Sequence, residues 1–560
     1  MRFEMSSFVP LHVHSSFSPA WGLHHPEKLC LAARNMGITR MALTDRNGLY
    51  GIPHFIQCAQ EAGIAPIIGS EAVTRDHRAV ILVQDQTGYE NLCRLLSDLH
   101  CRKNFDLPSS LARYRDGLCI LTDDTGVLKS LKKISSENLF VEMSPGHQMH
   151  RALALARDTG LSPVATTRTL FLDPEDHTLH RVLRAIHLNT RLSRLTASDV
   201  AAERDLLLSH ERIADYFPHC PEALENTARI ADRCFTDWNY SGFIFPSFNG
   251  MDDAKACETL RKKAMDGAVW RYGRITPELL KRFEREFVLI RDKGFAHYFM
   301  VVEELARRCK RTCGRGSAAA SLVAYCLGIT HVDPMKYNLF FERFLNEGRV
   351  DPPDIDIDFP WDERDDILDF AFARYGSRRT AMVANQVSFR ARGALREVAK
   401  VFGIPAVEIK AFTRRLSGFG RASKTGDRVY NHPLFSGEKI DGKWREIISI
   451  ASKLDGQLRH LSLHCGGLII VPDEIRRYVP VQVSAKGLPV IQWEKEQTEA
   501  AGLVKIDILG NRSLAVIRDA IAAVKSSTGV EIDYARMKPL EDPVTRKLIR
   551  DGRTMGCFYI

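Results

Sequence analysis

The chain has 560 residues, of which 45% are hydrophobic and 26% charged, and its formal net charge is +9. That length exceeds what one hydrophobic core supports, so we expect several domains. No apolar run approaches the roughly 20 residues that cross a bilayer, and the first residues lack the apolar core of a signal peptide. We therefore exclude a membrane-spanning protein and expect a cytoplasmic one, whose basic balance permits a polyanionic partner.

The first part of the chain alternates short apolar segments with amphipathic helical patterns. Buried strands are predicted at MALTD, APIIG, RAVILV, GLCILT, NLFVEM and SPVATT, with helices such as PEKLCLAARNMG and MHRALALARDTG between them. Repeated βα units of this kind predict a parallel sheet or barrel. Residues 236–252, which are rich in aromatic residues, glycine and turn formers, indicate a linker.

Helical patterns dominate residues 253–310, where Thr276 and Pro277 are suited to the N-cap and first turn of a helix. Residues 388–462 are mostly helical and basic. Strands are expected again in CGGLIIVP, LPVIQWE and GLVKIDIL, followed by a helix in SLAVIRDAIAAVKSS. The chain ends on the apolar, strand-like GCFYI, and because such a segment leaves an edge exposed we expect the sequence to be truncated.

The sharpest pattern is the acidic segment PPDIDIDFP. Strand periodicity places Asp354, Asp356 and Asp358 on one face and the intervening apolar residues toward a core. Aligned carboxylates repel one another and need a cation, and oxygen-only ligands suit Mg²⁺. The alternative, a solvent-facing acidic strand, is disfavoured because aspartate is a poor strand former.

A glycine-rich segment, CGRGSAAASL, lies upstream. Gly314, Gly316 and Ser317 predict a turn that runs into a helix start, where backbone N–H groups can bind phosphate and Arg315 adds charge. Such a turn alone is usually only a turn. Combined with the acidic strand it indicates nucleotidyl transfer, in which two metal ions clamp the attacking and leaving oxygens.

A third acid, Asp507, lies in the apolar segment GLVKIDIL with Lys505 on the same face. A lone buried aspartate is often a satisfied structural residue, and only the other two acids favour a metal role for this one. Lys505 would face a triphosphate or the primer backbone. Arg392, Arg396 and Lys400 share one helix face, which is either solvated or a phosphate contact.

These segments resemble the successive palm motifs of bacterial C-family DNA polymerases, the DNA polymerase III alpha subunits. The motifs are GRGSAAASLVAYCLGIT, DPMKYNLFFERFLNEGRVDPPDIDIDFPWDERDDIL, RHLSLHCGGLIIV and AGLVKIDILGNRSL. The resemblance implies an α/β multidomain protein with a polymerase-beta-like nucleotidyltransferase palm and an inserted helical thumb. It also implies template-directed DNA synthesis from dNTPs on primer-template DNA with two Mg²⁺ ions. A sliding clamp and other replisome subunits would be partners of the full-length protein.

The resemblance also implies roles for single residues. Asp356 and Asp358 would be metal ligands, Asp507 the third, and Asp354 a supporting position before the pair. Residues that would contact nucleotide or DNA are Gly316, Ser317, Arg315, Lys505, Arg349, Arg392, Arg396 and His464.

The segments LHVHSSFS, ALTDRNG and IIGSE resemble a PHP domain, a distorted βα barrel whose intact form binds a metal cluster and hydrolyses phosphoesters. The positions that match its ligands are His12, His14, Asp45 and Glu71; the positions that depart from it are Trp21, Arg46, Arg78, Arg168 and Leu170. Arginine stays protonated and repels a cation. We therefore expect no complete metal cluster, no exonuclease, and a domain that is structural or binds other subunits.

Five regions are expected. They are a PHP domain (1–235), the first part of the palm (236–387), the thumb (388–462), the second part of the palm (463–512) and the start of the fingers (513–560). The alternatives left open are a truncated, non-catalytic fragment and a PHP phosphoesterase or 3′–5′ exonuclease. Whether the parent protein is the main replicase or an error-prone accessory polymerase also stays open.

Overall fold

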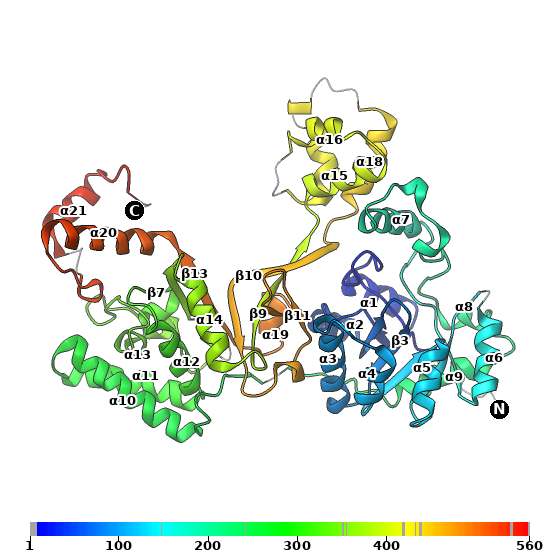
Figure 1. Cartoon of the computed structure of the whole chain (residues 1–560), viewed down its shortest axis with the longest axis horizontal. Helices are drawn as coiled ribbons and strands as arrows, with labels where there is room; N and C mark the ends of the chain where they lie inside the picture. Colours follow the sequence, from blue (N-terminus) through cyan, green and yellow to red (C-terminus); the bar gives the residue numbers. More distant parts are fainter. Residues whose placement is uncertain are drawn as a thin grey trace. The chain divides into compact units, whose positions relative to one another are not determined.

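The computed structural model (Figure 1) divides into two compact units, each formed by several chain segments. Unit 1 comprises Met1–Tyr240, Ala384–Leu463 and Arg476–Ala500, and unit 2 comprises Ser241–Val383, His464–Ile475 and Ala501–Ile560. The structure describes residues 8–146, 148–240, 242–349, 352–353, 355–416, 420–431, 433–435, 440–537 and 541–557. Asp354 and the last three residues of GCFYI lie outside these ranges. The five boundaries expected from the sequence stay a prediction.

A sheet of six strands in the order β1-β2-β3-β4-β5-β6 forms the centre of unit 1. The strands are β1 (Arg40–Leu43), β2 (Ala65–Val73), β3 (Arg78–Val83), β4 (Leu118–Thr122), β5 (Leu139–Met143) and β6 (Pro163–Ala165). All six predicted strands are confirmed, and the parallel arrangement expected of the sheet or barrel holds for the pairs β1–β2, β4–β5 and β5–β6 but not for β3. β3 is antiparallel to β2, because the hairpin of residues 74–77 is too short for the crossover that parallel strands need, and it is also antiparallel to β4.

The HxH segment lies between the two ends of this sheet. On one side Ala42 and Thr44 donate backbone hydrogen bonds to Pro10 and Val13. On the other side His14 N donates to the carbonyl of Thr169, in the segment that follows β6. Residues from both ends of the sheet therefore surround His12 and His14.

Helices fill the remainder of unit 1. They are α1 (Pro26–Asn35), α2 (Ile52–Ala62), α3 (Gln86–Cys101), α4 (Leu107–Arg113), α5 (Thr125–Lys132), α6 (Met149–Thr159), α7 (Asp176–His187), α8 (His210–Ala214), α9 (Pro221–Ala231), α15 (Ala391–Val401), α16 (Ala406–Thr413), α17 (Thr425–Asn431), α18 (Gly442–Ser452) and α19 (Lys495–Ala500). Helices at PEKLCLAARNMG, at MHRALALARDTG and through residues 388–462 are thereby confirmed. The short strands β11 (Val481–Val483) and β12 (Pro489–Ile491) pair antiparallel.

Unit 2 is built on strands in the order β9-β10-β13-β8-β7. They are β7 (Cys313–Arg315), β8 (Asp356–Pro360), β9 (Thr380–Ser388), β10 (Leu458–Ile470) and β13 (Lys505–Asn511), of which β9 and β10 contribute residues 380–383 and 464–470 to this unit. β13 runs parallel to β8 and antiparallel to β10. Ile357 and Phe359 are buried, as the alternation in the acidic segment predicts.

The helices of unit 2 are α10 (Asp253–Tyr272), α11 (Pro277–Asp292), α12 (Ala296–Ala306), α13 (Leu322–Cys326), α14 (Arg364–Tyr375), α20 (Arg512–Thr528) and α21 (Pro543–Arg550). α11 begins where predicted, because the side chain of Thr276 accepts a hydrogen bond from Leu279 N. The described residues of the predicted linker, 236–252, form no helix or strand. In the described part of the chain no helix is both long and apolar enough to span a membrane.

Candidate functional site

The aspartates predicted from the sequence lie on two adjacent parallel strands of unit 2. Asp356 and Asp358 are two residues apart in β8, so their side chains leave the same face. Asp507 of β13 is the register partner of Asp356. Side chains at paired positions of neighbouring strands share a face, so the sheet brings these three acids together.

Two groups hold the carboxylate of Asp358 from opposite sides. Arg315 of β7 places Nε 3.3 Å from Asp358 Oδ1 and 4.0 Å from Asp356 Oδ2. Asn511 donates a hydrogen bond from Nδ2 to Asp358 Oδ2 at 2.9 Å. Asp358 is 7% exposed, so these contacts compensate a largely buried charge.

Asp507 has a different neighbourhood. Its Oδ2 forms an ion pair with Lys505, whose side chain is only 2% exposed. Its Oδ1 is buried and has no hydrogen-bond partner among the described residues. His464 Nδ1 lies 3.9 Å from this oxygen, and the ring nitrogen instead accepts a hydrogen bond from Gly467 N at 2.8 Å. Lys505 was predicted from the sequence to face phosphate. In the structure its ammonium group pairs with Asp507 of the same strand.

This donor set fits a divalent cation. A buried carboxylate oxygen without a donor costs free energy that an adjacent cation would remove. Ligands that are all oxygen suit Mg²⁺. The three carboxylates are nevertheless spread over two strands: among the described residues, the only group of three possible ligands within 4.8 Å of one another is His12, His14 and Glu71.

The turn at Gly316 and Ser317 differs from the prediction. Gly316 has a φ of +68°, and Gly316–Ala320 forms a 3₁₀ turn, whereas α13 begins only at Leu322. The N–H groups of Leu322 and Val323 donate to Glu286 Oε2 at 2.7 and 3.2 Å. A carboxylate of the protein therefore occupies the N–H groups at the start of α13, and the phosphate contact expected at Gly316 and Ser317 stays a prediction. A phosphate contact would have to come from the turn itself.

The remaining basic residues lie elsewhere. The guanidinium of Arg349 donates to the carbonyl oxygens of Phe344 and Pro352 at 2.8 and 3.4 Å, which fastens the segment before β8. Arg392 and Arg396 are exposed on α15 of unit 1, as their spacing predicts. Among the predicted basic residues, the structure places Arg315, Lys505 and His464 next to the aspartates.

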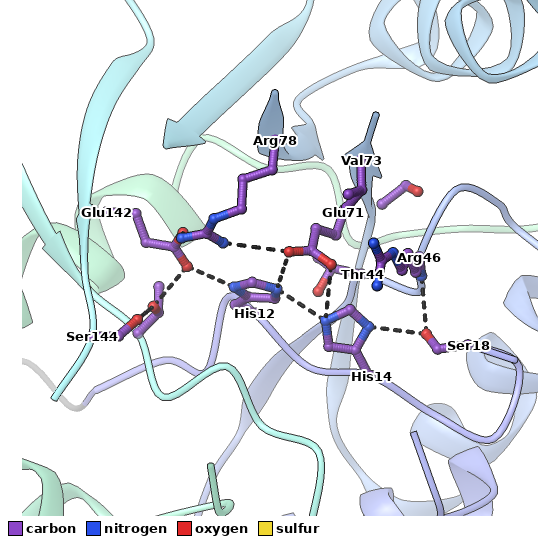
Figure 2. Close-up of polar contacts among 12 residues, drawn as sticks. His12, His14, Ser18, Thr44, Arg46, Glu71, Val73, Arg78, Glu142 and Ser144 are labelled. Carbon is purple, nitrogen blue, oxygen red and sulfur yellow. Dashed lines mark hydrogen bonds and ion pairs between the residues drawn. The ribbon is translucent and has the colours of Figure 1, made fainter. Parts of the chain in front are cut away.

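A second cluster lies in unit 1 at the HxH segment (Figure 2). His12 Nε2 is 3.0 Å from His14 Nε2 and 3.7 Å from Glu71, and His14 Nε2 is 3.6 Å from Glu71. Outer partners fix both rings: Glu142 lies 2.6 Å from His12 Nδ1 and Ser18 lies 2.9 Å from His14 Nδ1. Two imidazoles and a carboxylate with such outer partners are typical of a site for one metal ion.

Burial lowers the pKa of His14 to about 3, so this ring is neutral and able to ligate. Sequence reasoning missed Glu142 and Ser18. Glu142 had a signal, because it is a charged residue within the otherwise apolar strand NLFVEM.

Arg78 reaches into the same cluster and neutralises its acids (Figure 2). Its guanidinium lies 3.3 Å from Glu71, 3.0 Å from Glu142 and 2.8 Å from Asp123. Burial lowers the pKa of Arg78, but the charges of Glu142, Asp123 and Glu71 raise it well above its usual value. Burial raises the pKa of Glu71, yet nearby arginines and the charges that His12 and His14 carry at low pH lower it to about 2. A fixed cation therefore stands beside ionised carboxylates.

Asp45 matches a PHP metal ligand by sequence, but its carboxylate is hydrogen-bonded to two serines. Its carboxylate accepts hydrogen bonds from Ser15 N, Ser15 Oγ and Ser18 Oγ at 2.7, 2.7 and 2.6 Å. Burial raises the pKa of Asp45 to about 6, against those hydrogen bonds. Arg46 stacks over Trp21, with 4.7 Å between the guanidinium carbon and the ring centre.

Known families match both regions. Residues 258–510 match the family described as bacterial DNA polymerase III alpha NTPase domain, and residues 10–155 match the PHP domain. Residues 258–510 therefore belong to the bacterial DNA polymerase III alpha family, and the region before them contains a PHP domain.

Individual relatives match almost the whole chain. Across 99% of its residues it is 31% identical to the DNA polymerase III subunit alpha of Bacillus subtilis and covers 53% of that protein. It is 31% identical to the error-prone DNA polymerase of Symbiobacterium thermophilum, covering 55%, and 30% identical to that of Mycobacterium tuberculosis, covering 54%. The chain spans about half the length of these curated relatives.

Proposed function

We propose that this chain supplies the catalytic region of a template-directed DNA polymerase, which joins dNTPs to a primer 3′-hydroxyl. One observation carries the proposal: Asp356, Asp358 and Asp507 share one face of two paired strands, with Arg315 beside them. Longer relatives that are named DNA polymerases support it.

In this proposal the three aspartates hold two Mg²⁺ ions, which when bound would activate the primer hydroxyl and stabilise the leaving oxygen. The paired strands fix the spacing of the carboxylates before substrate arrives. Lys505 neutralises part of the acidic charge. Arg315, whose side chain is 52% exposed, can leave Asp358 for a triphosphate oxygen.

We also propose that the sheet of unit 2 is a polymerase-beta-like palm and that α15 to α18 form the thumb. The exposed face of α15 with Arg392, Arg396 and Lys400 suits phosphate contacts to primer-template DNA, which carry no sequence preference. Contacts with a sliding clamp or other replisome subunits, and a cytoplasmic location, stay predictions.

Primer extension tests the polymerase proposal. The chain is compared with the double variant Asp356→Ala/Asp358→Ala and with Asp369→Asn, an exposed acid of α14 that serves as the matched control. We expect Mg²⁺-dependent extension by the wild type and control, and a loss of about 1000-fold, or ~4 kcal/mol, in the double variant. Extension that survives the double substitution would refute the site. A wild-type chain that binds primed DNA but does not extend it would favour the non-catalytic fragment.

For the PHP domain we propose a structural or partner-binding role without phosphoesterase activity. His12, His14 and Glu71 fit one ion, but Arg78 already neutralises Glu71, and Asp45 is engaged by serines. Metal content and 3′-exonuclease assays on the purified chain test this. Stoichiometric Mn or Zn together with exonuclease activity that His12→Ala abolishes would overturn it.

A further inference from the structure

Asn511 stands between the last strand of the candidate site and the helix that follows it. It ends β13 and is the N-cap of α20, with extended backbone (φ −122°, ψ 119°). Its Oδ1 accepts a hydrogen bond from Ser513 N at 2.8 Å. Its Nδ2 donates to Asp358 Oδ2 at 2.9 Å. The half-buried side chain of Asn511 therefore accepts a hydrogen bond from the start of α20 and donates another to a candidate metal ligand.

The donor contact does more than a helix cap requires. Any side-chain oxygen of suitable length satisfies an N-terminal N–H group. A carboxylate rotates freely about its last torsion angle unless neighbours restrain it. With Oδ2 held by Asn511, Asp358 presents Oδ1 toward Arg315, whose Nε is also 4.0 Å from Asp356 Oδ2.

α20 has a second tie, to the residues that follow β8. Arg518 of this helix pairs with Asp362 at 2.7 Å and with Glu363 at 2.8 Å, directly after the strand that carries Asp358. The first turns of α20 are thus tied to β8 through Asn511 and to the residues directly after β8 through Arg518. A shift of the helix start would withdraw the Asn511 amide from Asp358.

We propose that Asn511 is a positioning residue, which orients Asp358 for a divalent cation and makes that orientation depend on the docking of α20. The metal role rests on the proposed function. The contact itself and its coupling to α20 stand on the geometry alone.

Two substitutions separate the cap from the donor. Asn511→Ser keeps a good capping oxygen but is too short to reach Asp358, whereas Asn511→Ala removes both contacts. Mn²⁺ affinity is measured by paramagnetic resonance titration, with Asp369→Asn as control. Because removal of an outer partner of a metal ligand weakens affinity by about 10- to 100-fold, we expect at least about a 10-fold loss in both variants. Faster amide hydrogen exchange in the first turn of α20 is expected in both variants, and more so in Asn511→Ala, which also loses the capping bond to Ser513 N.

A second measurement needs no metal. Asp358→Ala should speed exchange in the first turn of α20 when Asn511 is present, and should add nothing in the Asn511→Ser background. The positioning role would be overturned if Asp358→Ala left the exchange rate in the first turn of α20 unchanged in the wild-type background. It would also be overturned by unchanged Mn²⁺ affinity in Asn511→Ser. If substituting the three aspartates leaves Mn²⁺ affinity unchanged, the proposed function and the metal role are overturned. The hydrogen-exchange comparison of Asp358→Ala and Asn511→Ser then still tests whether Asn511 and Asp358 are in contact.

Discussion

A guanidinium group stands among carboxylates at both candidate sites, but the two arginines differ in exposure. Arg78 has a side chain that is 22% exposed and contacts three acids, whereas Arg315 is 52% exposed and contacts two. Removing one partner of a buried ion pair lowers the stability of the fold strongly, whereas removing one partner of an exposed pair lowers it little. Arg78 therefore acts as a fixed counter-charge, and Arg315 is free to exchange partners.

Replacing Arg78 tests the fixed counter-charge. Arg78→Met leaves buried carboxylates unpaired, so we expect unit 1 to lose ~3–5 kcal/mol of stability. Added Mn²⁺ should restore part of it, because His12, His14 and Glu71 can then accept a cation. Thermal unfolding with Mn²⁺ or a chelator measures both effects, and Arg75→Met, an exposed arginine of the same hairpin, is the control. A variant as stable as the control would contradict the interpretation.

The pKa of Glu71 predicts how acid affects unit 1. It lies at about 2 in the folded protein against an ordinary value of 4.5. A carboxyl group with a lowered pKa stabilises the fold above its unfolded pKa and loses that contribution as pH falls toward the folded one. We expect stability to decline from about pH 4.5 to pH 2, on the order of 3 kcal/mol from this group. Melting temperatures across that range should fall less steeply for Glu71→Gln, and equal slopes would contradict the assignment.

Among the elements, α11 supports the turn Gly316–Ala320 through side-chain hydrogen bonds at the C-terminal end of the turn. Arg282 and Glu286, one turn apart on that helix, form an ion pair of 2.6 Å. Arg282 also donates to the carbonyl of Ala320 at 3.1 Å, while Glu286 accepts from Ser321 Oγ at 3.0 Å. The position of the candidate nucleotide turn thus depends on a buried pair.

Glu286→Gln should loosen this turn and α13. Because the substitution breaks a buried, multiply hydrogen-bonded charge pair, we expect a loss of ~3 kcal/mol and faster hydrogen exchange through residues 316–326. Glu284→Gln on the same helix is the matched control, since its pair with Arg261 is 40–43% exposed. Exposed pairs contribute ~0–1 kcal/mol, so equal effects of the two substitutions would argue against the support role.

Sequence patterns predicted these elements unevenly, for physical reasons. Apolar runs and caps are local, so the six strands of unit 1 and the start of α11 were predictable. The start of α13 at Leu322 was not, because Glu286, which accepts from its first N–H groups, lies 36 residues upstream. The acids on β8 were predictable from alternation, whereas Asn511 was missed because its partner Asp358 is distant in sequence.

Across the whole molecule, unit 1 depends on segments far apart in the chain. Residues 476–500 pack on α3, where Arg476 pairs with Asp98 at 2.9 Å and Tyr89 donates to the carbonyl of Tyr478 at 2.8 Å. Trp493 in this segment is fully buried and donates to the carbonyl of Leu49. The PHP region is therefore not a self-contained segment of the sequence.

A fragment of residues 1–240 tests this dependence. It lacks the 476–500 segment, so part of α3 is left uncovered. We expect a lower urea midpoint for the fragment than for the same region in the whole chain, because less apolar surface is buried. Near-ultraviolet circular dichroism of both proteins during urea titration measures the two midpoints. Equal midpoints would mean that the later segments add no stability.

We propose that Asp356, Asp358 and Asp507 form the divalent-cation site of a DNA polymerase. Iron-mediated cleavage localises such a site, because radicals formed at bound Fe²⁺ cut the nearby backbone. We predict cuts near residues 356–358 and near residue 507, suppressed by excess Mg²⁺ and absent in Asp356→Ala/Asp358→Ala. Any cuts near His12 and Glu71 would report the PHP cluster separately. Cleavage confined to the PHP cluster, or cuts at β8 that survive the double substitution, would contradict the claim.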